Sequence, residues 1–116
     1  MKTRTLTQPL VDTLNENKAL QIIELNISPL TDIADYMIIC TATSKRHAHA
    51  LMDKLIATSK SMGISPLGVE GAETAEWILI DLGDAIVHIM LPEVRDFYAL
   101  EKLWSTPEYP PSNSHF

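Results

Sequence analysis

The sequence has little cysteine, few basic residues and no long uninterrupted apolar run, and each shortage excludes a class of protein. Its single cysteine, Cys40, excludes an intramolecular disulfide framework and a zinc site built on a CxxC pair, which favours a cytoplasmic location. Residues 1–10 contain two basic residues without the apolar segment of a secretory signal, and the most apolar stretch, residues 77–91, is interrupted by two aspartates and a histidine. We therefore expect neither a signal peptide nor a membrane span.

Basic residues are outnumbered by acidic ones, with nine Lys and Arg against fifteen Asp and Glu, a net charge of −6 and a pI near 5.0. Free nucleic acid is an unsuitable ligand for so acidic a chain, and a basic protein is the better expectation. Residues 44–62 nevertheless carry four bases and one acid, whereas residues 63–116 carry two bases and nine acids. The sequence thus predicts a polarised molecule, unless folding scatters these charges over both faces.

The 116 residues, of which 46% are hydrophobic, suit one globular domain with a proper core. Apolar residues at helical spacing predict a first helix over about residues 8–17, with Pro9 in its first turn. They also predict an amphipathic helix over residues 45–62 and a last helix that begins at Asp96 as its N-cap.

Five runs of strand length lie between these helices. The second of them, YMIICT, is apolar throughout, as expected for a strand covered on both faces, and the third is short enough for a sheet edge. The runs lie within residues 19–25, 36–41, 64–71, 77–82 and 85–91. We predict an α/β domain over residues 1–104, with a mixed β-sheet and flanking helices, followed by a proline-containing tail over residues 105–116 that we expect to be disordered.

The last two strands are joined by Gly83-Asp84, a two-residue hairpin turn that pairs Leu82 with Ala85 and fixes the register of the whole hairpin. One face of the hairpin is then uniformly aliphatic and is predicted to be core. The other face collects Trp77, Leu79, Asp81, Ile86, His88 and Met90. Either a helix covers this face as a second core layer, or it is partly exposed and forms a protein-binding hot spot, extended by Tyr98 and Trp104.

The helix over residues 45–62 begins with charged residues and has signals at both ends. Ser44 is a suitable N-cap, and Gly63 follows the helix as a C′ residue would. Lys45, Arg46 and His47 occupy its first turn, where free N–H groups favour a phosphate or carboxylate. The alternative is a capped and solvated turn, since the P-loop spacing is absent.

Candidate catalytic and metal-binding residues are present, but their spacing is unfavourable. Asp32 and Asp35 lie in or beside a loop and Asp84 lies in a turn, so that a magnesium site for nucleotidyl transfer is a weak hypothesis. His47 and His49 cannot share a helical face, which leaves no zinc site. Cys40 is predicted to be a small core residue, and no G-x-S-x-G motif is present. We expect no catalytic residues, no metal and no cofactor.

Several linked motifs lie between residues 8 and 104: TSKRH at 43–47, PLGVEG at 66–71, EW at 76–77, DLGD at 81–84, VH at 87–88, RDFY at 95–98 and LEKLW at 100–104. Together they resemble the ribosomal silencing factor family, also called Iojap-like. The resemblance implies an α/β fold related to nucleotidyltransferases but without transferase activity. It implies binding to the fourteenth ribosomal protein of the large subunit, a steric block to joining of the small subunit, lower translation when nutrients are scarce, and homodimers off the ribosome.

The resemblance also implies which residues contact the ribosomal protein, and the chain departs from the family at one place. Ala42 stands where the family has glycine, which weakens any ligand site in the turn that follows. For the turn itself, Ser44 to His47, two alternatives stay open: it contacts the partner, or it only organises the fold. A magnesium-dependent catalyst using Asp32, Asp35 or Asp81, or a dimeric scaffold, would be the alternatives. The implied contact residues are Trp77, Asp81, His88 and Tyr98, together with Glu70 and Arg95.

Overall fold

A computed structural model of the chain describes the backbone of residues 2–98 and the side chains of residues 7–96. The predicted tail and Trp104 lie outside these residues. Three helices and five strands follow one another in the order α1 (Lys2–Glu16), β1 (Leu20–Asn26), β2 (Tyr36–Thr41), α2 (Lys45–Ser61), β3 (Gly68–Glu70), β4 (Trp77–Asp81), β5 (Ala85–Met90) and α3 (Pro92–Tyr98).

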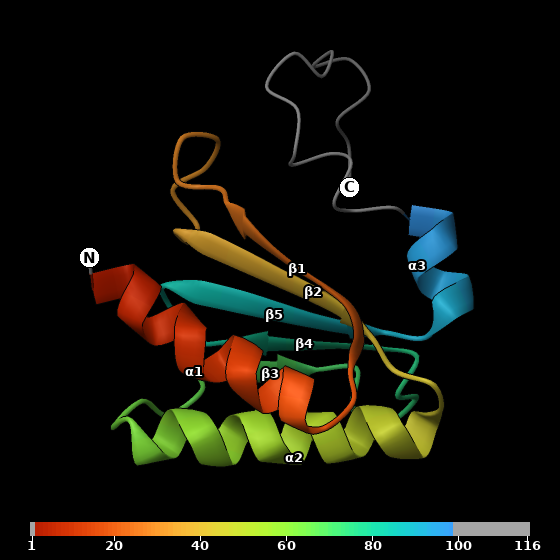
Figure 1. The fold of residues 1–116 in the computed structure, drawn as a ribbon. Coiled ribbons are helices and arrows are strands. Elements are labelled where there is room, and N and C mark those ends of the chain that lie inside the picture. Colours follow the sequence, from red (N-terminus) through yellow and green to blue (C-terminus); the bar gives the residue numbers. More distant parts are fainter. Residues whose placement is uncertain (1, 99–116) are drawn as a thin grey trace.

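The five strands form one mixed sheet in the order β1-β2-β5-β4-β3 (Figure 1). Strands β2 and β5 are parallel, and the other neighbours are antiparallel. The predicted α/β class, the interior position of β2 and the edge position of β3 are therefore confirmed. So is the hairpin register, since Ile78 pairs with Ile89 and Ile80 with Val87.

Helices α1 and α2 lie side by side on one face of the sheet (Figure 1). Their buried side chains meet the aliphatic side of the β4–β5 hairpin, as the two-residue turn predicted. This main core contains Leu10, Leu14, Ile38, Cys40, Ala48, Leu51, Leu55, Ile78, Ile80, Leu82, Ala85, Val87 and Ile89.

The opposite face of the sheet is covered only in part. The loop between β1 and β2 contributes Ile27 and Ala34 to a second, smaller core, and Val94 of α3 packs against it. These residues lie over Met37, Ile39 and Met90 of the two parallel strands. The second core therefore covers the β2–β5 part of this face.

Both ends of α2 form as the sequence predicts. The Ser44 hydroxyl accepts a hydrogen bond from the backbone N–H of His47, and its extended backbone begins the helix. After the helix, Gly63 adopts φ +81°, and the N–H groups of Gly63 and Ile64 donate to the carbonyls of Lys60 and Ser59. This is the Schellman arrangement, which favours glycine at C′.

Two helix starts differ from the prediction. Helix α1 begins at Lys2 rather than near Gln8, so that Pro9 lies inside the helix and not in its first turn. Helix α3 begins at Pro92, four residues before the predicted N-cap Asp96. A proline at the first helical position has no N–H to leave unbonded and already has the helical φ, which explains this earlier start.

Candidate functional site

The candidate site lies on the sheet face opposite α1 and α2, over β3, β4 and β5. Directly paired residues of antiparallel strands point to the same face, so the register aligns Glu70, Leu79 and His88 in one row across the sheet. Neighbouring rows pair Trp77 with Met90 and Asp81 with Ile86. We call this set the mixed face; its members are Glu70, Trp77, Leu79, Asp81, Ile86, His88 and Met90.

The mixed face passes from buried to exposed across the sheet. His88 is 5% exposed and Met90 is fully buried, whereas the side chains of β4 are partly exposed and Glu70 is exposed. The sequence left two alternatives for this face, a covered core layer and a partly exposed patch, and each holds for one part of it. The layer is covered toward β2 and partly exposed toward the β3 edge.

Trp77 and His88 form the centre of the mixed face. The indole Nε1 of Trp77 donates a hydrogen bond of 2.8 Å to Nδ1 of His88, and the two ring centroids lie 5.8 Å apart. Burial lowers the pKa of His88 from 6.5 to about 4, because the charged imidazolium is poorly solvated there. The imidazole is therefore neutral near pH 7, with Nδ1 as acceptor and the proton on Nε2.

The segment that leads from β3 into β4 packs against the backbone of Trp77. Gly71 has φ +82°, and a Cβ atom added there would collide with the carbonyl oxygen of Trp77. A cavity of about 470 Å³ lies beside this segment and is lined by residues 69–74, which include Glu70 and Glu73. An acidic lining of this kind suits a lysine or arginine side chain.

Asp81 has a role in the hairpin besides its place on the mixed face. Its Oδ1 accepts a hydrogen bond of 2.9 Å from the backbone N–H of Gly83, which lies in the turn with φ +89°. The carboxylate thus stabilises the turn and remains partly exposed. Its second oxygen keeps acceptor capacity for a donor from outside.

Arg95 is buried at the base of α3, apart from the exposed end of the mixed face. It is 5% exposed, and its Nη1 donates to the carbonyl of Gln21 at 2.6 Å and to Oγ1 of Thr41 at 3.0 Å. Gln21 lies at an irregularity of β1 with φ +51°. The guanidinium thus fastens α3 to β1 and β2, a role that no local sequence pattern indicates. Tyr98 belongs to the same helix, and its side chain lies outside the described residues.

The turn before α2 divides into structural and exposed residues. Nδ1 of His47 accepts a hydrogen bond of 3.0 Å from the Thr43 N–H, and its Nε2 lies 2.9 Å from the carbonyl of Asn17. With Ser44 as the N-cap, two N–H groups of the predicted anion site already have partners inside the protein. Lys45 and Arg46 are exposed.

Ala42, the departure from the family pattern, fits the turn without strain. Its Cβ is fully buried in the main core, and its backbone is not among the positive-φ residues of the described chain. Glycine is therefore not required at this position.

The candidate metal-binding residues do not form a ligand set. Asp35 and Asp84 are neighbours through the Asp35 N–H and the Asp84 carbonyl, while Asp32 is exposed in the loop. Within residues 7–96, no group of three or more His, Cys, Asp or Glu side chains could hold a metal ion. Burial raises the pKa of the Cys40 thiol to about 12, against a smaller opposing effect of Arg95, so that little of the nucleophilic thiolate forms near pH 7. No helix in the described range is long and apolar enough to cross a membrane.

Comparisons with known proteins agree on one family. The family model described as ribosomal silencing factor during starvation matches residues 1–114. The ribosomal silencing factor of Haemophilus influenzae is 45% identical over 100 residues, which is 86% of this chain and 98% of that protein. That of Chromobacterium violaceum is 39% identical over 104 residues, or 90% of this chain and 85% of that protein. A crystal structure from Chromobacterium violaceum superposes with a TM-score of 0.88 at 37% identity and covers 95% of this chain and 92% of that one.

Proposed function

Because the chain belongs to the ribosomal silencing factor family, we propose that it represses translation by keeping the two ribosomal subunits apart. In this proposal it binds the large subunit through the fourteenth ribosomal protein and occupies volume that the small subunit needs. The names of the relatives support a ribosomal role, and the partner and the steric block are our extension of it. We further propose that the protein works in the cytoplasm, under nutrient limitation, and forms homodimers away from the ribosome.

The observation that carries the proposal is the exposed end of the mixed face. A half-buried tryptophan is held in one orientation by His88, and the same face carries the aliphatic side chain of Leu79 and two carboxylates, Asp81 and Glu70, further along β4 and β3. Oriented aromatic side chains are the commonest anchors of protein interfaces, and rim charges govern the rate of association. A basic ribosomal protein fits this combination of apolar anchor and acidic rim.

The proposal assigns different work to the residues implied by the resemblance. Trp77, Asp81 and Glu70 contact the partner, and His88 positions Trp77 from beneath. Arg95 acts through α3, which carries Tyr98, because its own guanidinium is buried. Among the turn residues, Ser44 and His47 organise the fold.

We propose a mechanism without chemistry at a catalytic centre. Asp32, Asp35 and Asp81 do not assemble into a ligand set in the described chain, so the structure offers no support for the magnesium-dependent alternative. Steric exclusion needs only a bound protein of this size in the path of the small subunit.

Sedimentation of purified subunits tests the proposal. Large subunits, small subunits and the full chain are mixed at two salt concentrations, and binding and subunit joining are scored together. We expect the protein to travel with the large subunit and the joined fraction to fall. Trp77→Ala should lower affinity for the large subunit about thirtyfold, equivalent to about 2 kcal/mol.

A matched control separates interface loss from general damage. Ile33 is a 73% exposed apolar residue in the β1–β2 loop, so Ile33→Ala removes an exposed apolar group that is not part of the mixed face. It should leave large-subunit binding unchanged. A wild-type protein that stays at the top of the gradient at low salt would refute the proposal.

A further inference from the structure

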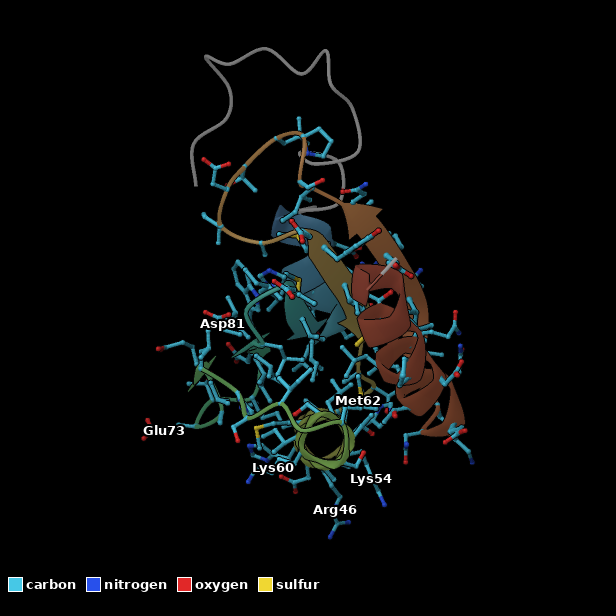
Figure 2. All side chains as sticks on the ribbon, turned by 90° about the vertical axis from the view of Figure 1, so that its left-hand side faces the viewer. Arg46, Lys54, Lys60, Met62, Glu73 and Asp81 are labelled. Atoms are coloured by element: carbon cyan, nitrogen blue, oxygen red, sulfur yellow. The ribbon has the colours of Figure 1, made fainter. Side chains whose placement is uncertain are left out.

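Helix α2 separates its residues into an apolar side and a basic side. The side that covers the sheet buries Ala48, Leu51, Leu55 and Ser59. The outer side exposes four cationic side chains, and Figure 2, which looks along the helix axis, shows three of them pointing away from the sheet. We call Arg46, Lys54 and Lys60, with Lys45 at the first turn, the basic face of α2.

Among the side chains of residues 7–96, the cations of the basic face have no carboxylate partner. No ion pair or side-chain hydrogen bond joins any of them to another residue of the described chain. Asp53 is the one acidic residue of α2. The exposed residues Ala50 and Ala57 have short side chains, so nothing bulky projects from these two positions. Their charge is therefore available to an anion that approaches from solvent.

The basic face contrasts with the rest of the molecule. Outside α2, the described side chains include twelve Asp and Glu but only two basic residues, Lys18 and the buried Arg95. Glu73 and Asp81 lie toward the β3–β4 edge, away from the outer side of α2 (Figure 2). The polarisation that the sequence predicted is thus real in space, with the mixed face and the basic face on opposite sides of the sheet.

We propose that the basic face of α2 contacts the phosphodiester backbone of RNA. The rise of an α-helix places Arg46 about 12 Å from Lys54 along the axis and Lys54 about 9 Å from Lys60. A row of cations at this spacing reaches several phosphates without reading bases, and the small alanines between them let a strand approach closely.

RNA fits this surface better than the other polyanions of a cell. A membrane-binding helix inserts large apolar residues beside its basic ones, and an acidic protein partner needs aromatic or aliphatic anchors. The exposed positions of α2 are Lys, Arg, Ala, Asp and Ser, and none is large and apolar. The proposal deepens the proposed function, on which it rests for the choice of ribosomal RNA as the source of the phosphates.

The expected binding is weak and strongly dependent on salt. The net charge of −6 opposes RNA binding by the molecule as a whole, which fits the expectation that free nucleic acid is a poor ligand. On the ribosome the mixed face would hold the protein in place, and the basic face would add oriented phosphate contacts.

Fluorescence anisotropy with a short labelled duplex RNA, in the absence of ribosomes, tests the proposal. Three phosphate contacts predict that the affinity of the full-length protein falls about thirtyfold between about 50 and 200 mM salt. The triple variant R46Q/K54Q/K60Q should lose this salt dependence and bind at least about tenfold more weakly at low salt. All three sites are exposed, so circular dichroism should report an unchanged fold.

Two further variants make the test specific for charge. R46K/K54R/K60R keeps the charge at each position and should bind RNA as the wild-type protein does. Asp53→Asn removes the acid from the same helix and should raise the affinity by a few fold. Tighter binding to phosphatidylglycerol vesicles or to polyglutamate than to RNA would overturn the assignment to RNA, as would equal RNA binding by the wild type and the neutral triple variant.

The RNA assay and the subunit sedimentation test the two proposals separately, so that either proposal can be refuted without the other. If the triple variant loses RNA binding but the wild-type protein does not sediment with large subunits, the proposed function is refuted and the RNA contact of the basic face still stands. If the wild-type protein sediments with large subunits but does not bind the RNA duplex, only the proposed RNA contact of the basic face is refuted. Trp77→Ala should leave RNA binding unchanged, because it lies on the opposite side of the sheet.

Discussion

Nε1 of Trp77 donates to Nδ1 of His88 across the β4–β5 hairpin, so a buried imidazole fixes the orientation of a half-buried indole. The bond requires an unprotonated Nδ1. The low pKa of His88, about 4, keeps the imidazole in that state down to acidic pH. The geometry of the proposed anchor and the stability of the domain are thus linked through one titrating group.

The stability of the domain should fall as the pH drops from about 6.5 to about 4. In the unfolded chain His88 titrates near 6.5, and in the fold burial lowers its pKa to about 4, so the unfolded state binds the proton more readily in this range. The stability that depends on neutral His88 is fully present above pH 6.5, the pKa in the unfolded chain, and is lost as the pH falls toward about 4, the pKa in the fold. Between about pH 7 and about pH 4.5 the loss should be roughly 2 kcal/mol, which urea unfolding at these two pH values measures.

His88→Gln isolates that contribution from the carboxylates that also titrate in this range. Glutamine accepts a hydrogen bond but does not titrate, so the variant should be less stable at neutral pH and show a shallower loss on acidification. Equal slopes for the wild type and the variant would show that His88 is not the linked group.

Gly71→Ala should destabilise the domain by more than about 2 kcal/mol and weaken large-subunit binding. The added Cβ meets the carbonyl oxygen of Trp77, so β4 must shift with the indole it carries. Gly63→Ala is the matched control, because Gly63 has nearly the same φ but nothing within 4 Å of the added atom. It should cost about 1 kcal/mol and leave binding unaffected; unfolding in urea and sedimentation give the two readouts.

Arg95→Met should lower the free energy of unfolding by about 2 to 3 kcal/mol. The change keeps an apolar stem but removes the donors to the Gln21 carbonyl and the buried Thr41 hydroxyl. Thr41→Val removes one acceptor only and should cost about 1 kcal/mol. A loss of large-subunit binding without loss of stability would instead place Arg95 in direct contact with the partner.

Ser44→Ala should cost about 1 kcal/mol through the lost N-cap of α2. Since the hydroxyl is engaged with the His47 N–H, we expect large-subunit affinity to stay the same once the variant is folded. Thermal unfolding measures the first effect and sedimentation the second. A drop in affinity with unchanged stability would assign the turn to the interface.

The features that sequence predicts well here depend on local chemistry. Gly83-Asp84 determines the register of the hairpin, and Ser44 and Gly63 determine the ends of α2, because turns and caps require particular side chains at particular positions. The starts of α1 and α3 were predicted too late. Pro9 suggested a first turn but lies inside α1, and Pro92 rather than Asp96 begins α3.

The features that sequence could not supply depend on distant contacts. The burial of Arg95 follows from the irregularity of β1 at Gln21, which turns a carbonyl toward α3 and which no local pattern specifies. Alternation along the strand left open whether His88 was covered or exposed, and the resemblance implied that it contacts the partner; the loop and α3 close over that side of the sheet and leave His88 buried. Nor does spacing reveal that His47 bridges Thr43 to Asn17.

The parallel pairing of β2 with β5 has a consequence for synthesis of the chain. Tyr36 finds its partner only when Ala85 has been made, so the apolar strand YMIICT waits for almost half of the protein. At about 5 to 20 residues per second this delay lasts several seconds, during which β1, α1 and α2 are available to shield the strand but its parallel partner is not. Cotranslational folding of this domain therefore ends with the insertion of the β4–β5 hairpin, and truncated chains that stop before it should be the ones that chaperones retain.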